Sequence, residues 1–129
     1  MKQSSIKLTG KKVLIVDDYV MNLDVLIAML KRMDCVVDFA KDGETAVEMH
    51  KKNGYDLILM DLVMPKLTGE EATEKIRQLK EPLNKVTIIA ITACNTPAER
   101  EVAFKAGIDD YLTKPIRLKE LEEKLKQYF

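Results

Sequence analysis

Short apolar runs alternate with segments of helical periodicity along most of the chain. The runs cover residues 13–16, 36–40, 57–60, 87–91 and 110–113. They are too short for helices and rich in aliphatic and β-branched residues, which predicts β-strands, and the uncharged runs are typical of strands buried on both faces. The run at 36–40 contains Asp38 and is less uniformly apolar, so we expect it at an edge of the sheet.

Amphipathic segments separate these predicted strands. Apolar residues recur at helical spacing in residues 22–33, 42–52, 70–79, 98–106 and 118–129. Asp42 is placed to cap the second of these helices, whereas Gly54 and Gly107 follow the ends of the second and the fourth. Strands that alternate with helices in this way predict an α/β fold, in which a parallel five-stranded sheet is covered by helices on both faces.

Polar residues gather where the predicted strands end. Asp17 and Asp18 follow the first strand, Asp61 the third, Thr92 the fourth and Lys114 the fifth. Caps and turns would explain each residue singly. They explain poorly why three acids, a hydroxyl and an amine share these positions while the strands are almost free of charge. Because the carboxyl ends of parallel strands meet at one edge of the sheet, we expect the five side chains to converge there.

Electrostatics indicates what such a cluster needs. Two carboxylates about 5 Å apart repel by roughly 3 kcal/mol at an effective dielectric near 20. A divalent cation and the ammonium of Lys114 would balance the charges of Asp17, Asp18 and Asp61. Oxygen ligands with some positions left to water favour Mg²⁺ over a transition metal. A metal-bound carboxylate beside a lysine and a hydroxyl is equipped to accept a phosphoryl group, so we expect Asp61 to be the nucleophile.

Composition excludes several other functions. A chain of 129 residues is one domain of ordinary size, and its 21 basic residues cancel 21 acidic ones, so no general field attracts nucleic acid or an anionic membrane. Cys35 and Cys94 have no paired spacing, and a single histidine, His50, cannot complete a Cys/His metal cluster. No apolar run approaches the roughly 18 residues of a membrane span. We therefore expect a cytoplasmic protein without direct nucleic-acid binding or membrane insertion.

Motifs at the predicted sheet edge carry a family resemblance. They are Asp17-Asp18, Asp61 with Met64-Pro65 and Gly69 after it, Thr92-Ala93, and Tyr111 ahead of Lys114-Pro115. Together and in this order, they make the sequence resemble a response-regulator receiver domain over essentially its whole length. Residues 11–129 form the receiver and residues 1–10 a polar lead. The resemblance implies a flavodoxin-like (βα)5 doubly wound fold with strand order 2-1-3-4-5.

The resemblance also implies the roles of the acids. Asp61 would accept a phosphoryl group from a phosphohistidine on a histidine kinase or a histidine phosphotransfer protein. Asp18, Asp61 and the backbone carbonyl of Val63 would bind Mg²⁺ directly, and Asp17 would act mostly through water. Such a domain takes part in phosphoryl transfer to itself without being a dedicated enzyme.

Further roles follow from the same resemblance. Lys114 would hydrogen-bond the phosphoryl group, Thr92 would close onto it, and Tyr111 would turn inward as Thr92 moves. The Lys114–Pro115 peptide bond would be cis, a state for which X-Pro pays only a modest penalty. The fourth helix, fifth strand and fifth helix would form the face that meets partners, and the domain would be a monomer or a weak dimer.

Two alternative functions match part of this pattern. A hydrolase of the haloacid dehalogenase type also uses an aspartyl nucleophile, but it needs a second Asp two residues later, where Asp61 is followed by Val63 and Asp18 by Val20. A receiver-like interaction module that is never phosphorylated would have lost the acceptor, a metal acid or the lysine, and none is lost. We expect no effector domain after the fifth helix, which leaves a stand-alone regulator, a phosphorelay intermediate or a receiver from a longer kinase.

Some residues are expected to be structural. His50 lies among Lys51 and Lys52 and is interpreted as a solvated surface histidine. Met60 and Met64 are expected to fill gaps in the core.

Departures from the family pattern bear on the chemistry. Asn22 and the run from Thr92 to Ile116 look most like receivers of hybrid histidine kinases. Tyr19 and Val20 stand where such receivers often have an Asn and an acid, so metal affinity is expected to be lower than usual.

The lifetime of the phosphorylated state is a testable consequence of the sequence. Val63 and Cys94, two residues beyond Asp61 and Thr92, would flank the approach to the phosphoryl group. Neither side chain orients a hydrolytic water well, so autodephosphorylation should be slow. We predict a phosphorylated state that lasts longer than in fast-signalling receivers; a half-life of seconds at neutral pH with Mg²⁺ would contradict this.

Overall fold

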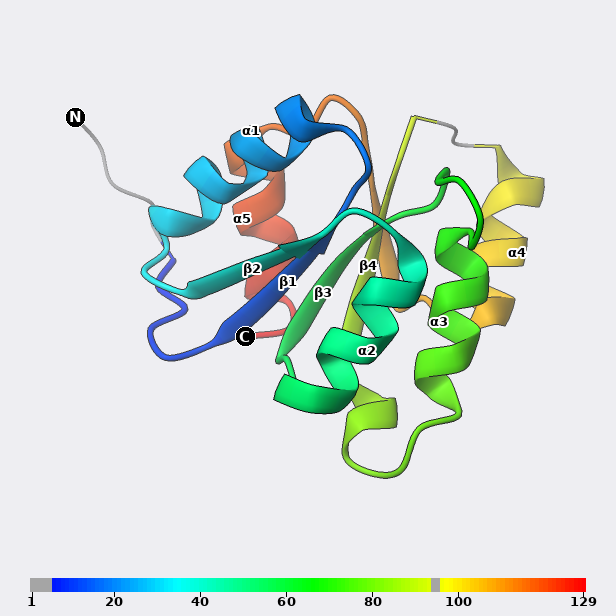
Figure 1. Cartoon of the computed structure of the whole chain (residues 1–129). Coiled ribbons are helices and arrows are strands. Elements are labelled where there is room, and N and C mark those ends of the chain that lie inside the picture. Colours follow the sequence, from blue (N-terminus) through cyan, green and yellow to red (C-terminus); the bar gives the residue numbers. More distant parts are fainter. Residues whose placement is uncertain (1–5, 94–95) are drawn as a thin grey trace.

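Five parallel strands form a single sheet at the centre of the molecule (Figure 1). The computed structural model describes residues 6–93 and 96–129. The strands are β1 (Lys12–Val16), β2 (Val36–Ala40), β3 (Leu57–Asp61), β4 (Thr87–Thr92) and β5 (Asp110–Thr113). Their order is β2-β1-β3-β4-β5, so the predicted flavodoxin-like fold is confirmed, with β2 at an edge as expected.

Helices cover both faces of the sheet (Figure 1). They are α1 (Val20–Lys31), α2 (Gly43–Asn53), α3 (Gly69–Arg77), α4 (Pro97–Ala106) and α5 (Leu118–Lys126), with a short 3-10 helix η1 (Leu83–Lys85) before β4. Helices α1 and α5 lie on one face, and α2, α3 and α4 on the other. Helix α1 starts before the predicted Asn22 because the carbonyl of Tyr19 already accepts the N–H groups of Asn22 and Leu23. In the described ranges no helix combines the length and apolarity that a bilayer span requires.

Alternation of side chains along the strands divides the core into two clusters. All five residues of β3 are buried, as the uncharged run predicted. Ile58 and Met60 face α2, α3 and α4, whereas Leu57 and Leu59 face α1 and α5. Met60 and Met64 both lie in the first cluster and fill the core as expected.

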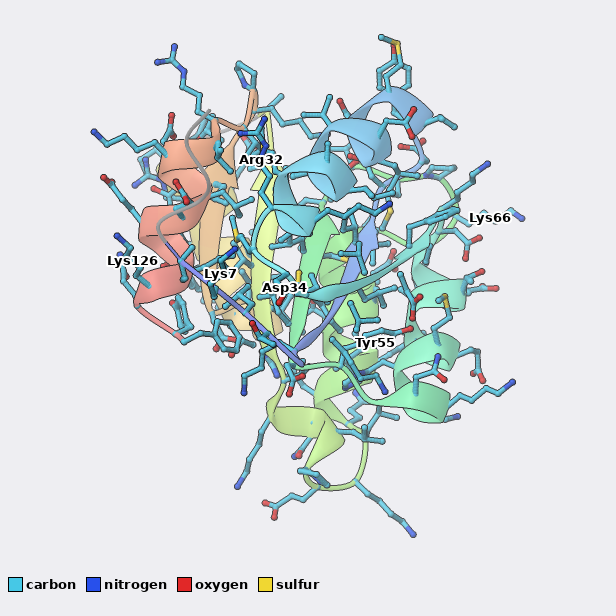
Figure 2. The ribbon with its side chains drawn as sticks, turned by 90° about the vertical axis from the view of Figure 1, so that its left-hand side faces the viewer. Lys7, Arg32, Asp34, Tyr55, Lys66 and Lys126 are labelled. Carbon is cyan, nitrogen blue, oxygen red and sulfur yellow. The ribbon has the colours of Figure 1, made fainter. Side chains whose placement is uncertain are left out.

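The segment before β1 packs onto the α1/α5 face. Ile6 and Leu8 are buried in the second cluster, and the N–H of Leu8 donates to the carbonyl of Met33 at 2.6 Å. Asp34, which follows α1, lies beside this segment (Figure 2) and accepts a hydrogen bond from the hydroxyl of Thr9 at 3.1 Å. This segment is therefore anchored at the end of the sheet where the strands begin.

Local sequence signals set the helix ends. Asp42 Oδ1 accepts the N–H of Thr45 at 2.7 Å, and Gly54 follows the end of α2, as predicted. Thr68 and Glu71 form a reciprocal capping box at the start of α3. Gly107 adopts φ 111° after α4, a left-handed conformation that favours glycine.

The structure corrects the predicted environment of His50. Only 1% of its surface is exposed, so the prediction of a solvated histidine was wrong. Its Nε2 donates to the carbonyl of Leu83 at 2.8 Å, and its Nδ1 accepts the N–H of Tyr55 at 3.2 Å. The error arose because Lys51 and Lys52 are neighbours in sequence only; His50 shares the buried face of α2 with Ala46 and Val47, four and three residues earlier.

Arg77 joins three separate segments at the end of α3. Its guanidinium donates to the carbonyls of Asn84, Val86 and Gly107 at 2.6–2.9 Å. It also pairs with Asp109 Oδ2 at 2.9 Å, and that oxygen accepts the N–H of Ile88. One side chain thus fixes the segment before β4 and the connection between α4 and β5 relative to α3.

We predict that Arg77→Lys lowers the free energy of unfolding by about 2 kcal/mol, because an ammonium cannot serve all the acceptors and leaves partly buried carbonyls unpaired. Urea unfolding measures the change. The matched control is Arg117→Lys, whose side chain is 79% exposed; it should leave stability within about 0.5 kcal/mol of the wild type. Equal effects of the two variants would contradict the role of Arg77.

Candidate functional site

Three acids meet at the carboxyl edge of the sheet. Asp17 and Asp18 follow β1, and Asp61 ends β3, the neighbouring strand, in which Met60 pairs with Val16. One carboxylate oxygen from each acid lies within 4.8 Å of the others. The sheet register therefore brings together residues that are more than forty positions apart in the sequence.

Two of these acids are buried, and one lysine faces them. Asp17 and Asp61 are 1% and 4% exposed, whereas Asp18 is exposed. The ammonium of Lys114 lies 3.5 Å from Asp17 Oδ2 and 3.5 Å from Asp61 Oδ2. The ammonium is thus paired with two of the three carboxylates, so these ion pairs leave an excess of negative charge at the site.

The pKa of Asp61 reflects its burial and the neighbouring acid Asp17. Burial raises the pKa of the Asp61 carboxyl to about 6, and the charge of Asp17 acts in the same direction. The N–H of Val63 and the ammonium of Lys114 favour the carboxylate form but offset only part of the burial. In the protein alone, the ionised Asp61 is therefore held at an energetic cost.

Backbone hydrogen bonds orient the buried acids. The N–H of Tyr19 donates to Asp17 Oδ1 at 2.9 Å, and the N–H of Val63 donates to Asp61 Oδ1 at 3.1 Å. Asp17 Oδ2 is buried and has no hydrogen-bond partner among the described residues; its approach to Lys114 is an ion pair without hydrogen-bond geometry. A buried carboxylate oxygen left without a donor, within a set of oxygen ligands, fits a hard divalent cation.

Thr92 and Lys114 reach the same edge from β4 and β5. Thr92 ends β4, is 6% exposed, and pairs in register with Thr113. The N–H of Lys114 donates to the carbonyl of Thr92 at 2.9 Å, which fixes the turn after β5 against the end of β4. The Lys114–Pro115 peptide bond in this turn is cis. Tyr111 lies two residues before Thr113 on β5, opposite Ala90 of β4.

Gly69 shapes the backbone next to the acceptor strand. A Cβ atom at Gly69 would lie 2.3 Å from the carbonyl oxygen of Asp61 and 2.7 Å from the Cα of Leu62. The N–H of Gly69 donates to the carbonyl of Leu62 at 3.1 Å. Any side chain here would push α3 away from the end of β3 and displace Asp61.

Exposed apolar side chains beside the acids were not anticipated from the sequence. Val20, Met21 and Val25 on α1 are 50–64% exposed, and Val63 is 69% exposed. A groove of about 340 Å³ lies next to them, between α1 and the turn after β5; it is lined by Asp17, Asn22, Val25, Leu26, Ile91, Lys114, Pro115 and Ile116. The sequence signal for this surface was that α1 carries apolar residues outside the row of residues that it buries, Leu23, Leu26 and Leu30. Cys94, which was expected to flank the site, lies outside the described residues.

Comparison with known proteins agrees with this geometry. A family model, the response regulator receiver domain, matches residues 13–126. Response regulator mcs4 of Schizosaccharomyces pombe is 36% identical over 141 residues, which covers 90% of this chain and 27% of the relative. Hybrid signal transduction histidine kinase G of Dictyostelium discoideum is 39% identical over 119 residues, 91% of this chain and 4% of the relative. The chain thus spans less than a third of either relative.

Solved structures give the same result. The receiver domain of the sensor histidine kinase PA1611 from Pseudomonas aeruginosa, with a magnesium ion in its active-site cleft, matches with a TM-score of 0.85 and 38% identity, over 93% of this chain and 98% of that one. The receiver domain of Ssk1 from Saccharomyces cerevisiae, crystallised with the histidine phosphotransfer protein Ypd1, matches with a TM-score of 0.83 and 35% identity, over 99% and 91%.

The strand order, the acids at the carboxyl edge and a match that covers almost the whole chain all agree. The relatives include response regulators and receivers of hybrid histidine kinases, as the motifs from Thr92 to Ile116 indicated. The chain belongs to the response regulator receiver domain family, the receiver modules of two-component and phosphorelay signalling.

Proposed function

We propose that this receiver domain accepts a phosphoryl group on Asp61 from a phosphohistidine. The observation that carries the proposal is the state of Asp61 itself, a carboxylate at the end of a buried strand with one oxygen held by Val63 and the other facing Lys114. A carboxylate that is fixed at one oxygen presents the other in a defined orientation for attack on an electrophile.

Mg²⁺ is the metal that we propose for the site. Asp18, Asp61 and the backbone carbonyl of Val63 would hold it, and Asp17 would contribute through water. The oxygen donors of this cluster and the magnesium in the cleft of the related PA1611 receiver support the choice. When bound, the ion neutralises the carboxylates and the equatorial oxygens of the phosphoryl group.

The transfer of the phosphoryl group from the phosphohistidine to Asp61 needs no further reactant. Asp61 Oδ2 forms a bond to phosphorus as the N–P bond of the phosphohistidine breaks. The bonding pair stays on the imidazole nitrogen of the donor. The ammonium of Lys114 and the hydroxyl of Thr92 are the groups of this chain that contact the phosphoryl oxygens in the product. Asp61 becomes an aspartyl phosphate.

A protein rather than a nucleic acid would deliver the phosphoryl group. The chain has no net charge, and the surface beside Asp61 presents the exposed apolar side chains of Val20, Met21, Val25 and Val63, which suit a protein surface. The related Ssk1 receiver was crystallised with a histidine phosphotransfer protein. We place the donor, a histidine kinase or a phosphotransfer protein, and this domain in the cytoplasm.

Phosphorylation of Asp61 is directly measurable. Incubation with a small phosphodonor and Mg²⁺ should give one phosphoryl adduct by intact mass, and Asp61→Asn should give none. Asp24→Asn, at an exposed acid on α1, is the matched control and should be modified like the wild type. Chelation of the metal should abolish the adduct. An adduct that persists in Asp61→Asn would exclude Asp61 as the acceptor.

The stability of the metal-free protein should depend on pH through Asp61. Its folded pKa of about 6 lies above the ordinary value of 3.8. The folded state therefore binds the proton more tightly, so stability falls as pH rises from about 4 to 6 and the penalty is complete above that window. Two units of pKa correspond to about 3 kcal/mol at most.

We therefore predict that Asp61→Asn raises the free energy of unfolding by about 1–3 kcal/mol at pH 7.5 without metal, and that the gain disappears near pH 4. Urea unfolding at both pH values, with a chelator present, measures it. Addition of Mg²⁺ should stabilise the wild type more than the variant. A gain that is the same at both pH values would show that burial of the charge is not its cause.

A further inference from the structure

Two side chains of α4 hold the ring of Tyr111. The guanidinium carbon of Arg100 lies 4.8 Å from the ring centroid, a cation–π contact, and the ring of Phe104 meets Tyr111 edge to face at 6.2 Å between centroids. Arg100 is partly buried, which strengthens such a contact relative to a fully solvated one. Tyr111 is thereby fixed against the helix that follows β4.

Tyr111 and Thr92 border one small cavity of about 10 Å³. It is also lined by Leu62, Glu99, Arg100, Ala103, Phe104 and Ile108. This volume accommodates one water molecule at most and leaves no room for an aromatic ring. Thr92 and Tyr111 thus flank the same small void, and Arg100 forms part of its wall.

We propose that Arg100 is a positioning residue that holds Tyr111 in its unphosphorylated arrangement and so sets how readily the domain switches. The inference rests on the proposed function, in which Thr92 closes onto the phosphoryl group. Movement of Thr92 towards Asp61 enlarges the cavity, and an enlarged apolar void loses packing contacts on all its walls. Movement of the Tyr111 ring towards Thr92 would carry it from its present position, in which the ring centroid lies 4.8 Å from the guanidinium carbon of Arg100.

Linkage then fixes the direction of the effect. A contact that forms only in the unphosphorylated arrangement weakens the binding of any ligand that favours the phosphorylated arrangement. The loss in binding free energy equals the free energy of that contact. Removal of the contact should therefore strengthen the binding of a phosphoryl group or its analogue, although Arg100 lies on a different element from Asp61.

The test compares Arg100→Met with the wild type in binding beryllofluoride, an analogue of the phosphoryl group, in the presence of Mg²⁺. Methionine keeps the length and apolar stem of the side chain and removes the charge. Binding should tighten about 3- to 10-fold, the range that a partly buried cation–π contact supplies. Arg100→Lys should fall between the two, because an ammonium stacks on a ring less well than a guanidinium. Arg117→Met, at the exposed arginine before α5, should bind like the wild type.

A second readout needs no ligand. The ring resonances of Tyr111, assigned by NMR with Tyr111→Phe, should move in ligand-free Arg100→Met towards the position that they take in saturated wild type. Binding within twofold of the wild type, or unmoved Tyr111 resonances, would overturn the inference. Failure of the wild type itself to bind the analogue, or equal binding by Asp61→Asn, would instead refute the proposed function.

Discussion

The structure depends on an uncompensated negative charge at one edge of its sheet. Asp17 and Asp61 are almost fully buried, Asp18 lies beside them, and the ammonium of Lys114 is the one cation paired with the buried acids among the described residues. Proteins rarely bury carboxylates without full compensation. A divalent cation bound by these acids, as proposed above, would supply the missing positive charge.

Rigid surroundings are what make such a cluster possible. Three neighbouring strands place the acids and Thr92 at one edge by their register, and the close approach of Gly69 fixes the end of β3. Arg77 fixes the segment before β4 and the connection between α4 and β5 relative to α3. These contacts prevent the carboxylates from moving apart to relieve their repulsion, so the fold keeps the site organised for its ligands.

Much of the fold and of the site could be predicted from sequence because the signals are local and repeated. Uncharged runs such as 57–60 predict buried parallel strands, and polar residues at strand ends converge by topology alone. His50 could not be placed in this way, since its lysine neighbours in sequence point elsewhere in space. The hydrogen bonds of Arg77 and the contact of Arg100 with Tyr111 join distant segments, and a single charged residue carries no periodicity from which such contacts could be inferred.

The segment before β1 and the last helix have one further consequence. Leu8 is tied to Met33 where the strands begin, and Phe129 lies near Lys11, with 5.8 Å between the ammonium and the ring centroid (Figure 1). Polypeptide joined to either side of the described domain would thus depart from the pole opposite Asp61. A tether, a neighbouring module or a fused tag attached there would leave the edge that carries Asp17, Asp18 and Asp61 sterically accessible.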